Sequence, residues 1–379
     1  MPIGSDKGFI VKPGFDPLAA QTSVSNSDFF SWGVNAYGQL GLGNTTNYSS
    51  PVQVGITEWL TFSAGYNWAG AIKTNNTLWM MGQNNLNQLG LGAADTTNRS
   101  SPTQVGALTD WEKLAVGAKS GLAIKTDGSL WAWGANAFGE TGQPTASRTA
   151  SPMQVGALTT WLTIAAGFYT SYAIKADGTL WSWGYGGNGR LGLNNTTNYS
   201  SPVQVGALTT WLEITAGYGW AAAIKTDGTI WMFGKNDRGQ LGQGTVSAGI
   251  SSPVQVGALT TWLKIASGAY HAMAIKTDGT LWAWGGNNFG GLGQGNTTNY
   301  SSPVQVGALT TWDKIAGGPH ASYAIKTDGA FWSWGYNHEG QLGVGNQTNY
   351  SSPVQVGALT SWSFLGKRSQ SYGAFALQF

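Results

Sequence analysis

Apolar and polar residues alternate over short segments along most of the chain, with the period of two that is typical of half-buried strands. In residues 262–307 this pattern predicts four strands, at 262–266, 272–276, 281–284 and 303–306. The pair Asp278-Gly279 separates the second segment from the third, as expected for a tight hairpin. Pro303 opens the fourth segment, which suits an outer strand whose first N–H needs no partner.

This unit recurs along the chain. Its clearest marker is a glycine that follows an aromatic-rich strand, and these glycines are 49, 52, 50, 50, 51 and 50 residues apart. The seven marker glycines are Gly33, Gly82, Gly134, Gly184, Gly234, Gly285 and Gly335. A proline and a lone tryptophan recur in phase with them. Self-similarity at a period of this length indicates a solenoid, a propeller or an array.

Four short strands in each of seven units, with no segment of helical periodicity, predict an all-β fold. The architecture that fits best is a seven-bladed β-propeller with four-stranded blades, in which radial closure leaves only short edges. Residues 28–379 form this propeller in the prediction. Residues 1–27 do not repeat and are predicted to form an extended N-terminal arm.

The two ends of the repeat region complement each other. Residues 29–32 form a third strand with no first or second strand before it, whereas residues 362–365 and 372–379 form a first and a second strand with no hairpin after them. We therefore predict one blade shared between the N- and C-terminal strands, which closes the ring and removes exposed sheet edges. The tryptophans, the Ala-Ile-Lys lysines and the Asp-Gly turns recur in most units, so we expect them to build the scaffold.

Composition excludes several kinds of function. Only 9% of the residues are charged and the net charge is +2, without the basic patch expected of a nucleic-acid-binding protein. No apolar run is long enough for membrane insertion. There is no cysteine, and the three histidines lack the spacing of a zinc site. No nucleophile–base arrangement is visible, so we expect a protein that is not an enzyme, with no cofactor and no metal.

A second glycine also recurs, at the end of each first strand, and the three residues that follow it differ in every unit while their flanks stay similar. These variable triplets are residues 66–68, 118–120, 168–170, 218–220, 269–271, 319–321 and 367–369. In a ring, these variable triplets would surround one face or the mouth of the axial channel. Loops that carry aromatic residues on a rigid scaffold suit recognition; alternatively, they only fill the channel. The residues predicted to bind a partner are Tyr66, Trp68, Lys119, Tyr169, Trp220, Tyr270, His271 and His320.

The N-terminal arm is the second candidate region. Residues 8–15 combine apolar residues with proline and glycine, and Phe9, Ile10 and Phe15 are the side chains predicted to dock on a neighbouring molecule. An apolar arm beside a rigid disc with few charges fits a component of a larger assembly.

The repeat resembles that of the RCC1 family (regulator of chromosome condensation 1). The features that carry the resemblance are the Asp-Gly turn, the Trp-Gly strand end, a histidine position filled here by His271, and a Gly-Gln-Leu-Gly loop, which occurs at residues 38–41, 239–242 and 340–343. The resemblance covers residues 28–379 and implies a propeller. Through the founding member, the resemblance also points to guanine-nucleotide exchange activity on a small GTPase. However, this chain has near-identical repeats and neither a basic tail nor a long insertion.

The leading hypothesis is a non-catalytic structural or display protein of a phage particle, associated with its tail or capsid. Its partners would be other proteins, either virion components or a host surface receptor. The alternative is a soluble bacterial RCC1-like interaction protein in the cytoplasm, which could act as a guanine-nucleotide exchange factor-like regulator of a small GTPase.

Overall fold

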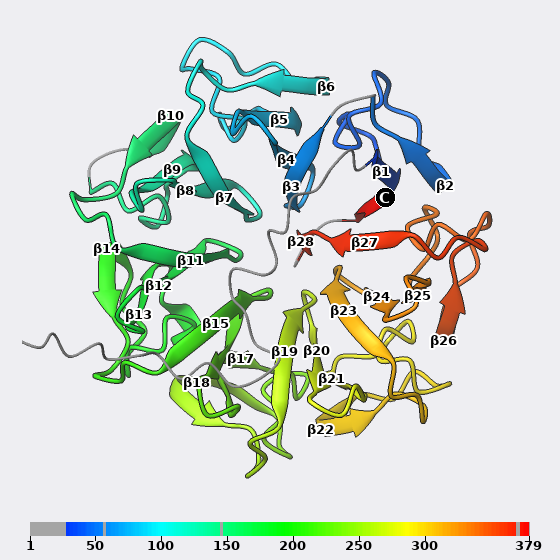
Figure 1. Cartoon of the computed structure of the whole chain (residues 1–379). Helices are drawn as coiled ribbons and strands as arrows, with labels where there is room; N and C mark the ends of the chain where they lie inside the picture. Colours follow the sequence, from blue (N-terminus) through cyan, green and yellow to red (C-terminus); the bar gives the residue numbers. More distant parts are fainter. Residues whose placement is uncertain (1–27, 56–57, 145–146, 369–371, 379) are drawn as a thin grey trace, which may run out of the picture.

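A computed structural model describes residues 28–378, except 56–57, 145–146 and 369–371. Seven antiparallel sheets are arranged as blades around a central axis (Figure 1). The described part of the chain contains no α-helix, and its one short helical turn lies at Gly187–Gly189. The predicted all-β, seven-bladed propeller is confirmed. The predicted arm, with Phe9, Ile10 and Phe15, lies outside the described residues.

Each blade has four strands, which follow one another from the axis to the rim (Figure 1). Equivalent strands of different blades therefore lie at the same distance from the axis. The innermost strands are β3 (Trp59–Ala64), β7 (Trp111–Val116), β11 (Trp161–Ala166), β15 (Trp211–Ala216), β19 (Trp262–Ser267), β23 (Trp312–Gly317) and β27 (Trp362–Leu365). The second strands are β4 (Trp68–Lys73), β8 (Ser120–Lys125), β12 (Thr170–Lys175), β16 (Trp220–Lys225), β20 (His271–Lys276), β24 (Ala321–Lys326) and β29 (Gly373–Gln378).

The third and fourth strands complete the blades toward the rim. The third strands are β5 (Leu78–Gly82), β9 (Leu130–Ala135), β13 (Leu180–Gly184), β17 (Ile230–Asn236), β21 (Leu281–Gly285), β25 (Phe331–Gly335) and β1 (Asp28–Gly33). The outermost strands are β6 (Arg99–Gln104), β10 (Arg148–Gln154), β14 (Tyr199–Gln204), β18 (Ser247–Gln255), β22 (Tyr300–Gln305), β26 (Tyr350–Gln355) and β2 (Tyr48–Gln53).

The ring closes through a blade built from both ends of the repeat region, as predicted. Its strand order is β2-β1-β29-β27, and β29 pairs with β1 over the full length of both strands, from Asp28 opposite Gln378 to Gly33 opposite Gly373. A two-residue strand, β28 (Lys367–Arg368), adds to this closure because it pairs in parallel with β3 of the neighbouring blade. The sequence pattern had placed Lys367 and Arg368 among the variable triplets and did not predict this pairing.

Tryptophans join neighbouring blades. The tryptophan directly before the marker glycine is fully buried, and its indole N–H donates a hydrogen bond to a backbone carbonyl of the preceding blade. The bonds are Trp32 to Gln341, Trp133 to Gln88, Trp183 to Glu140, Trp284 to Gln240 and Trp334 to Gly291, at 2.8–3.0 Å. Each bond satisfies a buried donor that would otherwise destabilise the core.

The Ala-Ile-Lys lysines lie against pairs of tryptophans. In the blade of β15 to β18, Lys225 Nζ lies 3.5 Å from the ring centre of Trp231 and 5.0 Å from that of Trp211. The same arrangement occurs at Lys73, Lys125, Lys175, Lys276 and Lys326. Such cation–π contacts stabilise by about 0.5–2 kcal/mol each. These residues therefore belong to the scaffold.

The closing strand offers a direct test of ring stability. Phe375 in β29 is 1% exposed and its ring lies 5.9 Å from those of Phe29 and Phe62. We expect Phe375→Ala to lower the free energy of unfolding by about 3–5 kcal/mol, because it leaves a cavity at the junction of the two chain ends. Urea denaturation followed by tryptophan fluorescence measures the change. Leu359→Ala, at an exposed position, is the control and should change stability by less than about 0.5 kcal/mol; equal effects of the two substitutions would contradict the closure account.

Candidate functional site

The two faces of the propeller carry different loops. Because the strands are antiparallel, the turns between first and second strands lie on the same face as the loops that follow the third strands. This face carries the triplets and is called the variable face below. The Asp-Gly hairpins and the connections between blades lie on the opposite face, called the hairpin face.

The marker glycines hold the variable triplets in place. All seven have φ between +96° and +106°, where residues with a Cβ are strained. A Cβ at any of them would collide with the carbonyl oxygen of a residue in the turn between the first and second strands, such as Asn67 for Gly82 or Tyr270 for Gly285. The residue after each marker glycine donates its N–H to that same carbonyl, at 2.8–3.4 Å. The constant scaffold thus fixes the backbone of the variable turns.

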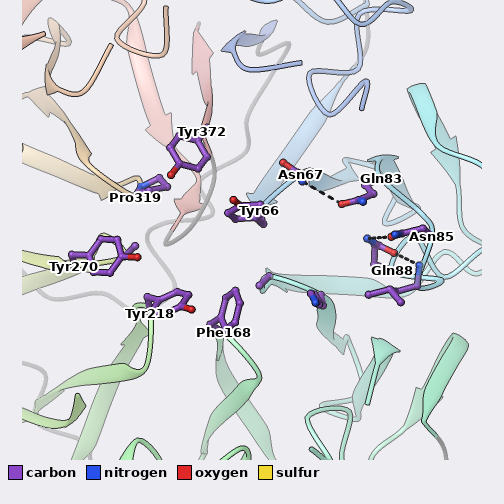
Figure 2. A pocket seen from close by; sticks show the side chains of 14 residues that line it. Tyr66, Asn67, Gln83, Asn85, Gln88, Phe168, Tyr218, Tyr270, Pro319 and Tyr372 are labelled. Carbon is purple, nitrogen blue, oxygen red and sulfur yellow. Dashed lines mark hydrogen bonds between the residues drawn. The ribbon is translucent and has the colours of Figure 1, made fainter. Parts of the chain in front are cut away.

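These turns surround a cavity of about 490 Å³ on the ring axis. All seven blades contribute to its lining, and Figure 2 shows the labelled side chains converging on it. The lining residues are Tyr66, Asn67, Gln83, Asn85, Leu86, Gln88, Ala118, Lys119, Phe168, Tyr218, Ala269, Tyr270, Pro319 and Tyr372. The volume lies within the range typical of small-molecule sites.

One side of the cavity is aromatic. This aromatic wall consists of Phe168, Tyr218, Tyr270, Tyr372 and Tyr66, and adjacent rings contact one another or are linked through His320 and Tyr336. The centres of successive rings lie 4.3–6.4 Å apart, from Phe168–Tyr218 through Tyr218–Tyr270, Tyr270–His320, His320–Tyr336 and Tyr336–Tyr372 to Tyr66–Tyr372. These contacts restrict the rings and preorganise the wall.

The other side is lined by amides. This amide wall consists of Asn67, Gln83, Asn85 and Gln88 (Figure 2). Asn67 Nδ2 donates to Gln83 Oε1 at 3.3 Å, and Gln88 Nε2 donates to Asn85 Oδ1 at 3.4 Å. Gln88 Oε1 also accepts the Leu86 N–H at 2.7 Å, which anchors its side chain. Asn67, Gln83 and Asn85 still have donor or acceptor capacity for a ligand, whereas Gln88 is 1% exposed and supports Asn85 from behind.

The cavity has little charge. In the part of the chain that the structure describes, Lys119 is the one charged residue that lines it, and its Nζ lies 5.2 Å from the ring centre of Tyr169. Burial, followed by the charge of Arg238, lowers the pKa of His320 to about 4, so this histidine is neutral at pH 7. Burial raises the pKa of Tyr372 to about 12 and also raises that of Tyr270, so both hydroxyls stay protonated.

The structure separates the predicted partner-binding residues into two groups. Tyr66, Lys119 and Tyr270 line the cavity, with Tyr66 44% exposed. His320 stacks on Tyr270 with 5.0 Å between ring centres and an interplanar angle of 17°. Tyr169 contacts Phe168, with ring centres 4.4 Å apart. These five residues therefore lie at the cavity or directly behind its wall.

Trp68, Trp220 and His271 do not reach the surface, and the expectation that they are displayed is corrected here. They are at most 1% exposed, because they begin second strands and point between blades. The indoles of Trp68 and Trp220 donate to the carbonyls of Gly117 and Ala269, respectively, at 3.0 and 2.9 Å. His271 Nε2 and Ser322 Oγ form a hydrogen bond of 2.8 Å. All three connect one blade to the next and support the cavity from below.

Several lining residues were not predicted. Phe168, Tyr218, Asn67 and Pro319 lie within the variable triplets, so the variation already marked them. In contrast, four lining residues lie in the loop after the third strand β5: Gln83, Asn85, Leu86 and Gln88. The composition of this loop resembles that of the equivalent loops in other repeats, so nothing in the sequence marked it. Tyr372 belongs to the turn of the shared blade. Because the sequence of this blade departs from the repeat, the pattern did not show that Tyr372 occupies the same position as the residues that line the cavity from other turns.

Two other hollows lie at the rim, of about 440 and 420 Å³. They are lined by constant residues of the repeat, including the Trp59–Trp79 and Trp211–Trp231 pairs, and so belong to the scaffold. Among the described residues, no group of three or more His, Asp or Glu is placed to hold a metal ion. No helix in this part of the chain has the length and apolar character needed to span a membrane.

Comparison with protein families agrees with the fold. The profile of the RCC1-like domain matches residues 146–370, and profiles of the regulator of chromosome condensation (RCC1) repeat match residues 28–72, 75–124 and 111–140. Together these matches cover most of the ring. The chain belongs to the RCC1-like domain family.

Several known proteins are similar in sequence to about a third of this chain. The X-linked retinitis pigmentosa GTPase regulator of Canis lupus familiaris is 34% identical over 31% of this chain and 12% of its own length. The ultraviolet-B receptor UVR8 of Arabidopsis thaliana is 30% identical over 35% of this chain and 30% of its own length. The secretion-regulating guanine nucleotide exchange factor of Bos taurus is 26% identical over the same shares. The matched region thus spans less than a third of each relative.

Solved structures share the RCC1-like fold over nearly the whole chain. Human WBSCR16 has a TM-score of 0.83 at 18% identity and covers 93% of this chain and 99% of its own. Prp20p from Saccharomyces cerevisiae, which binds Gsp1p and histones, has a TM-score of 0.81 at 19% identity, with coverage of 94% of this chain and 92% of its own. These likenesses confirm the propeller architecture.

His271 makes the stability of the propeller sensitive to acid. Burial lowers its pKa in the folded state to about 3, with a smaller effect from His320, whereas an unfolded histidine titrates near 6.5. Below pH 6.5 the unfolded state binds a proton that the folded state does not, so stability falls as the pH decreases toward 3. We expect His271→Gln to reduce the loss of unfolding free energy between pH 7 and pH 4.5 by up to about 2 kcal/mol. Urea denaturation at both pH values measures this difference, and an identical loss in wild type and variant would refute it.

Proposed function

We propose that this chain is a non-catalytic recognition scaffold that binds its partner at the axial cavity of the variable face. The observation that carries the proposal is the coincidence of two patterns. The turns that differ between repeats all contribute residues to one cavity, whereas the constant residues form the blades that hold it. A rigid framework with variable loops is a common arrangement for binding.

The composition of the cavity supports binding rather than chemistry. Among the described residues, its lining has five aromatic rings, four amides and one lysine, and no carboxylate, histidine or cysteine that could act as a general base or nucleophile. Aromatic side chains supply a large contact area with few rotatable bonds, which limits the entropy lost on binding. The aromatic wall is also fixed by ring–ring contacts before any partner arrives.

We further propose that the scaffold acts as a display protein of a phage particle, on its tail or capsid, and recognises another virion protein or a receptor on the host surface. Near-identical repeats, a charged fraction of only 9% and a non-repeating N-terminal segment with apolar residues support this assignment. A disc that binds through its axis leaves its rim and hairpin face for attachment to an assembly.

The particle itself provides the test. We expect mass spectrometry of purified particles to detect this chain, and we expect particles that carry Tyr66→Ala/Tyr270→Ala to adsorb to host cells at least about tenfold more slowly, because two rings of the aromatic wall are lost. Leu208→Ala/Leu259→Ala, at exposed positions of the hairpin face, is the matched control and should adsorb normally. Absence of the chain from the particles would refute the virion assignment. Normal adsorption of particles with the aromatic double variant would refute recognition through the cavity.

A second candidate function is guanine-nucleotide exchange on a small GTPase. Two relatives named secretion-regulating guanine nucleotide exchange factor, of 26% and 27% identity, favour it. Against it, the described residues form a propeller without a long insertion between blades that could enter a nucleotide site.

A nucleotide-release assay separates the two functions. With a bacterial small GTPase loaded with fluorescent GDP, we expect the purified chain to leave the release rate within about twofold of the intrinsic rate. EDTA, which removes Mg²⁺ and releases the nucleotide, is the positive control. Acceleration of a hundredfold or more at micromolar chain would favour the exchange factor over the recognition scaffold.

A further inference from the structure

The two walls of the axial cavity differ in chemistry, and together they define a class of ligand. One wall presents aromatic ring faces and edges, whereas the opposite wall presents primary amides (Figure 2). A ligand that satisfies both must have an apolar side of C–H groups and a polar side of groups that donate and accept hydrogen bonds. Sugar rings have this character, because their C–H groups cluster on one face and their hydroxyls project from the edge.

We propose that the axial cavity binds the neutral end of a carbohydrate chain, with a sugar ring stacked on the aromatic wall and its hydroxyls bonded to the amide wall. This inference rests on the proposed recognition function and names the ligand of the same site. A cavity of about 490 Å³ is large enough for more than one sugar ring.

Tyr270 is the best-placed stacking platform. On one side its ring is supported by His320, which lies nearly parallel at 5.0 Å, and Arg238 lies 4.6 Å from its centre. Tyr218 packs beside it, with ring centres 5.6 Å apart. A platform held from several directions loses little freedom when a ligand stacks on it. Tyr66, which is 44% exposed and lies 5.9 Å from Tyr372 between ring centres, offers a second ring to the ligand at the other end of the aromatic wall.

The amide wall matches vicinal hydroxyls. The Asn67–Gln83 hydrogen bond uses one N–H of Asn67 and one lone pair of Gln83 Oε1. Asn67 Oδ1 can then accept a hydrogen bond from the ligand, and the neighbouring Gln83 Nε2 can donate one to it. A pair of neighbouring hydroxyls on a sugar ring both donates and accepts, and can bond to both amides at once. The internal hydrogen bond fixes the spacing between the two amides before the ligand binds.

Charge distinguishes a sugar from the other ligands that aromatic sites bind. An aromatic cage for a quaternary or methylated ammonium requires open π faces, usually with acidic groups nearby. Among the described residues no carboxylate lines the cavity, whereas the positively charged Lys119 does. A proline-rich peptide is the second alternative, but such peptides dock in elongated aromatic grooves. The wall of this cavity instead closes around an axis, with contributions from all seven blades.

Calorimetric titration of the purified full chain tests the inference. The probes are maltoheptaose, chitotetraose and a branched mannose pentasaccharide, with deca-proline and trimethyl-lysine as the competing ligand classes. We expect at least one neutral oligosaccharide to bind. Tyr270→Ala should weaken that binding about tenfold through the loss of stacking, whereas Tyr270→Phe should retain it. Gln83→Leu should also weaken binding, and Leu259→Ala on the hairpin face should leave it unchanged.

The outcomes separate this inference from the proposed function. No binding of any oligosaccharide, binding of deca-proline or trimethyl-lysine alone, or oligosaccharide binding unaffected by Tyr270→Ala would overturn the carbohydrate assignment. Recognition through the cavity would still stand if Tyr66→Ala/Tyr270→Ala abolished attachment to host cells in the same preparation. If that attachment were also unchanged, the proposed function itself would fail. Thermal unfolding of each variant checks that its propeller remains folded.

Discussion

The close contact between each marker glycine and the carbonyl of a neighbouring turn is the constraint on which the site depends. At φ near +100° and with no Cβ, the glycine lets the third strand approach the turn, and the next residue donates its N–H to the same carbonyl. Because the bond is made by backbone atoms, it imposes almost no requirement on the turn's side chains. Tyr66, Lys119, Phe168 and Tyr270 can therefore differ freely while their backbones keep equivalent positions around the axis.

The rest of the molecule keeps these seven turns in one ring. Buried indoles such as that of Trp284 bond to carbonyls of the preceding blade, and lysines such as Lys225 pack over tryptophan pairs toward the rim. Strand β29 lies between β1 and β27 and so joins the two ends of the repeat region within one blade, which closes the ring. Since an open ring would separate Tyr372 from Tyr66, which lie 5.9 Å apart between ring centres, closure also completes the aromatic wall.

Most of the fold and part of the candidate site could be predicted from the sequence. Fixed spacing of the glycines and tryptophans was sufficient to predict seven blades and the shared one, because repetition turns a weak local pattern into a strong one. Variation within the repeat correctly pointed to the turns that hold Tyr66, Lys119 and Tyr270. The variation could not show that the third residue of a triplet, as at Trp68, Trp220 and His271, is buried between blades. This burial depends on where the second strand begins and on which side of it each side chain lies. Nor could the variation find Gln83 and Asn85, which reach the cavity only through the curvature of a loop.

Recognition at the axial cavity is the central claim, and a structure of the chain within its native assembly, bound to its partner, tests it most directly. The account predicts that the partner covers the variable face and that its contacts include Tyr270, Tyr218 and the amides of Asn67 and Gln83. A partner seated on the hairpin face or the rim, with the axial cavity left open to solvent, would contradict it.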